Sequence, residues 1–175
     1  MKTSIIREAG FEEALLGISL SYNSGGDMKV VADKLVKRGG SHSKFLESIA
    51  VWLDITAPRY WWSHADTYRV GVTKQSESTM HTIMRRHLVK DDFEGRQVLN
   101  PHLKSINMSI DRGDFDSVKA YLPESFLQRR IVCTNYMTLQ RIIRQRRTHE
   151  LIEWHQFCDD VLAQCRHPEF LEEAE

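Results

Sequence analysis

The sequence predicts an α+β fold in which helices predominate over a few strands. Two observations indicate this class. Apolar residues recur at helical spacing in several segments, while short stretches elsewhere are rich in β-branched and aromatic residues. The 41% of hydrophobic residues can form a real core. The chain of 175 residues is expected to be a single domain spanning residues 1–175, without internal repeats or low-complexity tracts.

The first elements are expected to be a strand and two helices. A short strand is predicted at Lys2–Ile6, followed by an amphipathic helix at Phe11–Leu20. Asn23–Asp27 is a strong loop signal because it combines Asn, Ser, Gly and Asp. Asp27 is expected to cap the next helix by accepting hydrogen bonds from its free amide groups. An apolar stripe indicates that helix, and Gly39-Gly40 ends it.

The next segment is expected to contain the best-defined strand. Ser41 is predicted to cap a short helix that runs through Ser48. Ile49–Thr56 is predicted to be a strand because β-branched and aromatic residues dominate it, and Ala57-Pro58 ends it. A helix is expected directly afterwards at residues 59–65, with the proline near its first turn.

The rest of the chain is expected to be mostly helical. Residues 66–80 are polar and lack a regular period, which predicts an irregular or functional loop. Thr138 is a candidate cap for a helix that begins at residue 139. The remaining elements are expected to be helices at residues 79–87, 101–110, 115–121, 139–147 and 149–165, a charged loop at 90–100 and a strand near 125–134.

Charge and cysteine content exclude several classes of protein. The formal net charge is zero, which argues against a general nucleic-acid-binding protein but leaves a local basic pocket open. Cys133, Cys158 and Cys165 are an odd number without C-x-x-C spacing, so neither a disulfide framework nor a zinc ribbon is expected. No apolar run reaches membrane-spanning length, and the N-terminus does not resemble a signal peptide. We therefore expect a cytoplasmic protein without membrane partners.

Arginines are concentrated between residues 128 and 147, where six arginines occur without a single acid. Arg141, Arg144 or Gln145, and Thr148 fall on one face of the predicted helix. A guanidinium binds phosphate or the edge of a pyrimidine ring through two parallel hydrogen bonds. The pattern therefore indicates an anionic ligand such as a nucleotide, and a solvated basic face is the alternative.

Other chemical motifs are incomplete. His149-Glu150 resembles half of a zinc-protease motif, but the second histidine of H-E-x-x-H is missing, so no metal site is expected. Cys133 follows two apolar residues and is expected to be buried and inert. Trp52 is expected to pack in the core.

The loop at residues 66–79 is dense in hydroxyl groups and also carries Arg69, Lys74 and Gln75. Such groups suit the recognition of phosphate and sugar. A plain surface loop is the alternative, but the tryptophan-rich segment before it is expected to anchor this loop. We favour a binding role.

Several of these segments, from about Gly39 to Phe157, resemble the flavin-dependent thymidylate synthases. His42 and the residues up to Ser48 are similar to the family's His-x5-His segment, with Ser48 in place of the second histidine. Ile49–Pro58 is similar to the strand that follows it. Where the family carries Arg-His-Arg, this chain has Thr67-Tyr68-Arg69. The later part of that signature falls at Lys74–Met80, where its Arg-Tyr is missing and its Ser lies one place off.

The C-terminal part of the resemblance is closer in spacing. Leu122-Pro123, Asn135, Arg146 and His149 match the family's pattern in order. Lys119 occupies the place of a phosphate-binding arginine, Arg141 replaces a second asparagine, and Arg146 matches the arginine that holds the pyrimidine ring and assists its activation. Asn135 matches an asparagine on the flavin side.

The resemblance implies a small antiparallel sheet packed with helices, a homotetramer with sites between subunits, and the reductive methylation of dUMP. FAD would supply hydride, methylenetetrahydrofolate the carbon and NADPH the reducing power. An altered activity on a pyrimidine nucleotide, and a non-catalytic relative that binds nucleotides or assembles, are alternatives. The implied site residues are Arg146 for catalysis, Lys119, Arg69, Gln75, Ser76 and Ser78 for substrate, and His42, Asn135, Arg141 and His149 for cofactor.

Overall fold

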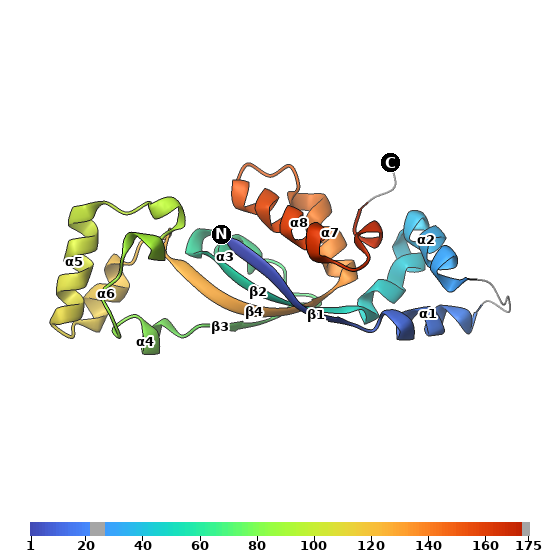
Figure 1. Ribbon diagram of the computed structural model, residues 1–175, viewed down its shortest axis with the longest axis horizontal. Helices are drawn as coiled ribbons and strands as arrows, with labels where there is room; N and C mark the ends of the chain where they lie inside the picture. Colours follow the sequence, from blue (N-terminus) through green and yellow to red (C-terminus); the bar gives the residue numbers. More distant parts are fainter. Residues whose placement is uncertain (22–26, 173–175) are drawn as a thin grey trace. The chain divides into compact units, whose positions relative to one another are not determined.

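The computed structural model describes residues 1–21 and 27–172. The chain combines helices with a four-stranded antiparallel sheet of strand order β1-β2-β4-β3, so the predicted α+β class is confirmed (Figure 1). The strands are β1 (Lys2–Ala9), β2 (Ala50–Pro58), β3 (Thr73–Ser76) and β4 (Leu127–Asn135).

The chain divides into two compact units. Unit 1 comprises residues 1–2, 55–68 and 75–130, and unit 2 comprises residues 3–54, 69–74 and 131–175. The expectation that residues 1–175 form a single domain stays a prediction.

Unit 2 contains most of the helices that the sequence predicted. They are α1 (Phe11–Ser19), α2 (Met28–Arg38), the 3-10 helix η1 (Gly40–Ser48), α7 (Tyr136–Arg146) and α8 (Ile152–Gln164). The 3-10 turn η4 (Pro168–Phe170), which also belongs to this unit, was not predicted. The predicted cap of α2 is confirmed, because Asp27 Oδ1 accepts a hydrogen bond from Lys29 N at 2.9 Å. Gly39 ends this helix with a φ of 64°, a left-handed conformation that favours glycine.

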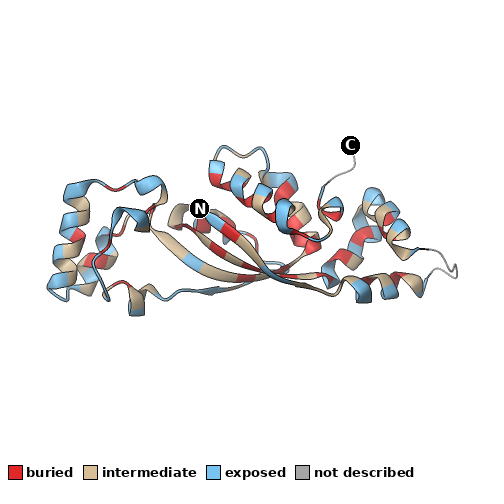
Figure 2. Cartoon of the chain, in the orientation of Figure 1, coloured by how far each residue is buried: buried red, intermediate tan, exposed pale blue. Residues whose placement is uncertain are grey.

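The core of unit 2 lies between β2 and the pair α7 and α8, which pack side by side (Figure 1). Val51 and Leu53 of β2 are buried, and so are Leu139 and Ile143 of α7. Figure 2 shows buried residues in red on the strands and on the helices. The expectation for Trp52 was wrong. It alternates with its buried neighbours on the strand and is therefore only half-buried, with the Arg7 guanidinium 6.0 Å from its ring.

Side chains of α8 protect the free edge of β1. Asp160 Oδ2 accepts from Thr3 N at 3.2 Å, and Gln164 Oε1 accepts from Ile5 N at 3.0 Å. Gln164 Nε2 also donates to Thr3 O at 3.1 Å. These bonds satisfy backbone groups that an edge strand otherwise exposes to pairing with another chain.

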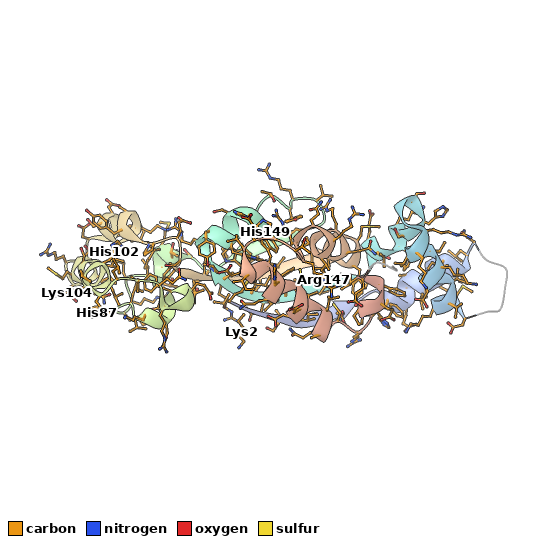
Figure 3. All side chains as sticks on the ribbon, turned by 90° about the horizontal axis from the view of Figure 1, so that it is seen from above. Lys2, His87, His102, Lys104, Arg147 and His149 are labelled. Atoms are coloured by element: carbon orange, nitrogen blue, oxygen red, sulfur yellow. The ribbon has the colours of Figure 1, made fainter. Side chains whose placement is uncertain are left out.

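Unit 1 contains α3 (Arg59–Ala65), α4 (Thr79–Thr82), the 3-10 turns η2 (Lys90–Asp92) and η3 (Glu94–Arg96), α5 (Asn100–Asp111) and α6 (Phe115–Tyr121). A separate hydrophobic cluster joins the residues that follow α4 to α5 and α6. Its buried members are Ile83, Leu88, Phe93, Val98, Ile106, Val118 and Leu122. His87, His102 and Lys104, labelled in Figure 3, also belong to this unit.

Several predicted boundaries were wrong. The loop expected at residues 66–80 contains strand β3, and α4 ends at Thr82 instead of residue 87. The short helix after Gly39 is a 3-10 helix without a side-chain cap, so Ser41 does not cap it. The last long helix begins at Ile152, later than expected. The predicted loop Asn23–Asp27 lies outside the described residues except for Asp27.

Candidate functional site

The ten residues singled out from the sequence are divided between the two units. Unit 2 holds His42, Arg69, Asn135, Arg141, Arg146 and His149, and unit 1 holds Gln75, Ser76, Ser78 and Lys119.

A basic hollow in unit 2 contains the predicted arginine face. Arg141 and Arg144 of α7 line a hollow of about 510 Å³, together with Gln140 and Met137 from the same helix. Lys37 at the end of α2 faces it as well, and Glu172 contributes a carboxylate. The other lining residues are Val36, Gly39, Gly40 and Ser43. Two of the positions predicted to share a helix face, Arg141 and Arg144, therefore lie on one wall. Three cationic side chains converge on this hollow, which suits an anionic ligand.

Arg146 belongs to a different environment from Arg141. Its guanidinium lies 5.0 Å from the ring centroid of Trp154, a residue of α8 that is 1% exposed. A cation over an indole face is attracted by the negative face of the ring. This contact gives the half-buried Arg146 a rigid support at the end of α7, and its orientation is therefore set by packing from α8.

His149 lies in the turn between α7 and α8, two residues after Arg147, and both are labelled in Figure 3. Its Nδ1 accepts a hydrogen bond from Leu151 N at 3.1 Å, so the ring proton of the neutral imidazole is on Nε2. His155 Nε2 donates to His149 O at 2.6 Å. Both bonds hold the turn in place.

Asn135 caps α7, a role that the sequence analysis gave to Thr138. Asn135 Oδ1 accepts from Thr138 N at 2.9 Å, so the prediction for Thr138 was wrong. The loop at Gly71 packs tightly against this junction. A Cβ at Gly71, which has a φ of 69°, would lie 2.7 Å from Thr138 Oγ1 and 3.0 Å from Asn135 Nδ2. The Oδ1 atom of Asn135 is therefore satisfied by the helix cap without any ligand, and the Nδ2 atom of Asn135 faces the loop.

Arg69 and Asn135 line a shallow hollow of about 430 Å³ that also includes Gly71, Thr73 and Cys133. Cys133 is half-buried at this wall, so the expectation that it is buried was wrong. The strand alternates, and Val132 on the other face is the buried neighbour.

His42 is exposed and lies on a third hollow of unit 2, of about 700 Å³, which does not include Arg141. Its walls are mainly apolar, with contributions from Ala14, Ile18, Leu35 and Phe45. Two of the residues implied as cofactor ligands, His42 and Arg141, thus line separate hollows.

In unit 1, Lys119 lies next to the predicted hydroxyl-rich segment. Its Nζ atom donates to Thr79 Oγ1 at 2.7 Å, directly after the exposed Ser78, which precedes α4. Gln75 and Ser76 are exposed on β3. Lys119 is half-buried and forms no ion pair within residues 1–21 and 27–172. A neutral hydroxyl does not balance the charge of this ammonium group, so Lys119 can attract an anionic ligand.

Arg130, another member of the arginine cluster, is fully engaged within unit 1. Its Nη1 atom donates to both carboxylate oxygens of Asp66 at 3.0 and 3.1 Å, and its Nε and Nη2 atoms donate to Gln128 Oε1. Its guanidinium also stacks 4.2 Å from the Trp62 ring, whose Nε1 donates to Gln128 O. These contacts make Arg130 a structural residue that ties α3 to β4.

A buried polar network in unit 2 was missed by the sequence analysis. The hydroxyl of Tyr136, which is 0% exposed, donates to Glu8 Oε1 at 2.6 Å and accepts from His167 N at 3.3 Å. Burial and the Glu8 hydrogen bond raise the pKa of Tyr136 well above its usual value, so the phenol keeps its proton. Glu8 lies 128 residues and His167 lies 31 residues from Tyr136 in sequence, and no local pattern indicates these pairs.

Within the described part of the chain, no three His, Cys, Asp or Glu side chains are grouped in a way that could hold a metal ion. Over the same residues, no helix is long and apolar enough to span a membrane.

This chain has the fold of the flavin-dependent thymidylate synthases, as its likeness to solved structures shows. The chain is similar to the crystal structure of ThyX from Helicobacter pylori complexed with FAD and dUMP, with a TM-score of 0.80 and 16% sequence identity over 98% of both chains. A second Helicobacter pylori ThyX structure with FAD and dUMP gives a TM-score of 0.77 and 16% identity, over 98% of this chain and 97% of that one. No protein-family model and no curated protein matches the sequence. At this identity the likeness shows the fold.

Proposed function

We propose that this protein binds a pyrimidine deoxynucleotide of the dUMP type and acts on its base as a flavin-dependent thymidylate synthase-like enzyme. The observation that carries this proposal is the likeness over 98% of the chain to solved structures that hold FAD and dUMP. The residues of each unit support it separately.

Lys119 is proposed to bind the phosphate of the nucleotide. It is half-buried and donates to the neutral hydroxyl of Thr79, and Ser76 and Ser78 lie in the segment that leads to this threonine. Ammonium and hydroxyl groups are common phosphate ligands. Gln75 and Arg69 are proposed as further substrate contacts, each within its own unit.

Arg146 is proposed to hold the pyrimidine ring and to stabilise negative charge that develops on it. A guanidinium suits this task because its planar array of donors matches the oxygen atoms of the ring. Its stacking on Trp154 supports the proposal, because a catalytic donor is most effective when its orientation is fixed before the substrate binds.

The donor set of the basic hollow fits the anionic part of a flavin dinucleotide, because Lys37, Arg141 and Arg144 can balance two phosphates. Arg141, His42, Asn135 and His149 are the proposed contacts to FAD, which when bound would supply hydride for the reaction. Tyr68, which stands where the family has a histidine, is 7% exposed and packs inside unit 1. Contacts to the flavin ring are therefore proposed to differ from those of the family.

The resemblance extends the proposal to methylenetetrahydrofolate as carbon donor, NADPH as reductant, a homotetramer and a cytoplasmic location. A non-catalytic nucleotide-binding or assembly protein is the second candidate. It is favoured by the cap of α7, because that role explains why an asparagine occupies position 135 without any flavin.

Absorbance and calorimetry test the proposal. The purified protein, with FAD added, is expected to show the absorbance of bound flavin at about 450 nm. It is also expected to bind dUMP. Arg146→Ala is expected to weaken dUMP binding by about 1.5–3 kcal/mol, the value of a hydrogen bond to a charged group. Arg112→Ala, at an exposed arginine of unit 1, is the matched control.

The outcomes separate the two candidates. Binding of dUMP without any uptake of FAD would leave the non-catalytic candidate and reject the flavin enzyme. Equal dUMP affinities for Arg146→Ala and Arg112→Ala would reject the assigned role of Arg146.

A further inference from the structure

Glu172 is the only carboxylate among the described residues that line the basic hollow. It faces a wall of α7 on which Gln140, Arg141 and Arg144 follow one another at helical spacing. The same face continues to Arg147, labelled in Figure 3, whose Nη1 atom lies 3.5 Å from Glu172 Oε1. The hollow thus contains an anion that belongs to the chain itself.

The segment before Glu172 is firmly anchored. Phe170 and Leu171 are 0% and 1% exposed, and Gln140 Nε2 donates to Phe170 O at 3.0 Å. Leu171 N and Glu172 N both donate to Pro168 O, at 2.9 and 3.1 Å. Because the backbone is fixed up to this point, it positions Glu172 at the hollow with little further loss of conformational entropy.

The side chain of Glu172 is held much less firmly than its backbone. It is 49% exposed, and its contact with Arg147 is a single ion pair at the rim. An exposed ion pair of this kind contributes little to stability. Its carboxylate can therefore leave the hollow by rotation of its own side chain, without unfolding the segment that carries it.

We propose that Glu172 is a built-in counter-anion of the basic hollow, which a ligand carrying a diphosphate displaces when it binds. This inference rests on the proposed function for the kind of ligand, since a flavin dinucleotide and a free nucleoside diphosphate share that group. Glu172 lowers the affinity of the hollow for both ligands. A ligand with a single phosphate displaces the carboxylate less effectively than a ligand with a diphosphate does.

The test is calorimetric titration of the full chain with inorganic pyrophosphate, the shared chemical group, at low ionic strength. Glu172→Gln keeps the size of the side chain and removes its charge. It is expected to bind pyrophosphate about 3 to 10 times more tightly, as expected for removing one charge at short range near a protein surface. Glu12→Gln is the matched control, because Glu12 is an exposed glutamate of α1 that does not line the hollow. This variant is expected to bind pyrophosphate as the unaltered chain does.

A double-mutant cycle with Arg144→Gln makes the test specific to the hollow. Arg144→Gln alone is expected to weaken pyrophosphate binding and to reduce the gain from Glu172→Gln. Thermal unfolding of each variant checks that the fold is retained. Equal affinities of Glu172→Gln and the unaltered chain would overturn the proposal, and so would a full gain from Glu172→Gln that persists without Arg144. The absence of pyrophosphate binding in every variant would overturn it as well.

Failure of the proposed function has a different signature. A chain that binds neither dUMP nor FAD, but whose affinity for pyrophosphate rises on Glu172→Gln, would retain this inference and reject the proposed function. A chain that binds dUMP and FAD with affinities unaffected by Glu172→Gln would do the reverse.

Discussion

Replacement of Tyr136 by phenylalanine tests the buried network that ties three distant segments of unit 2 together. The substitution keeps the ring in its fully buried site and removes only the hydroxyl. Glu8 Oε1 then loses its 2.6 Å donor, and His167 N loses its acceptor. Burial and the Glu8 bond raise the pKa of Tyr136, so the lost group is a protonated donor over the whole working range of pH.

The magnitude follows from the charge and burial of the partner. A hydrogen bond to a charged group contributes about 1.5–3 kcal/mol. The side chain of Glu8 is 6% exposed, so water replaces the lost donor poorly. Arg166 N remains within 3.1 Å of Glu8 Oε2 and offsets part of the loss. We therefore expect Tyr136→Phe to lower the free energy of unfolding by about 2 kcal/mol, which lowers Tm by about 4–8 °C in a chain of this size.

Urea denaturation and calorimetry of the two variants Tyr136→Phe and Tyr121→Phe measure this effect. Tyr121 is 54% exposed, and its replacement is expected to change the free energy of unfolding by less than about 0.5 kcal/mol. If both variants unfold at the same denaturant concentration, the hydroxyl of Tyr136 does not stabilise the fold, and the network has no energetic role.

Three further predictions concern charge and thiol chemistry. Lys119→Gln is expected to weaken dUMP binding at least tenfold, about 1.4 kcal/mol, and to reduce its dependence on salt, which calorimetry at two ionic strengths measures. Among the thiols, Cys133 is expected to react first with a thiol reagent, because Cys158 and Cys165 are buried. Burial raises the pKa of Cys158 to about 11 and that of Cys165 to about 12. The contribution of these two protonated thiols to the free energy of unfolding is therefore fully present below their ordinary pKa. It is lost as the pH rises through 11 to 12. Urea denaturation at alkaline pH measures this loss.

Local patterns predicted the helices well because their signals lie within a few residues. Asp27 caps α2 and Gly39 ends it, as their residue types predict. The cap of α7 was misplaced because β4 passes into the helix without a linker. Asn135 and Thr138 are both good caps, and only the end of the strand pairing decides between them.

Strand β3 and the position of Trp52 show two different limits. Thr73–Ser76 is entirely polar and has no apolar face, so only its pairing with β4 makes it a strand. No local signal could have found it. The partial exposure of Trp52 could have been predicted from the sequence. Its neighbours Val51 and Leu53 are buried, and the two-residue period of a strand places Trp52 on the opposite face of the sheet.

The arginine cluster was recognised from the sequence as one feature, but the structure divides it by the partners of each guanidinium. Arg130 is held by Asp66, Gln128 and the Trp62 ring, and such a residue contributes to folding. Gln128 is close to Arg130 in sequence, but Asp66 lies 64 residues away and Trp62 is in the same distant segment, so spacing alone cannot reveal these partners. The convergence of Arg141 with Lys37 and Glu172 has the same origin, since the end of α2, the middle of α7 and the segment after η4 meet only in the folded unit. A count of charges in the sequence therefore predicts whether a binding site is cationic or anionic. The carboxylates that pack against the site in the folded chain determine which of its cationic side chains can bind a ligand.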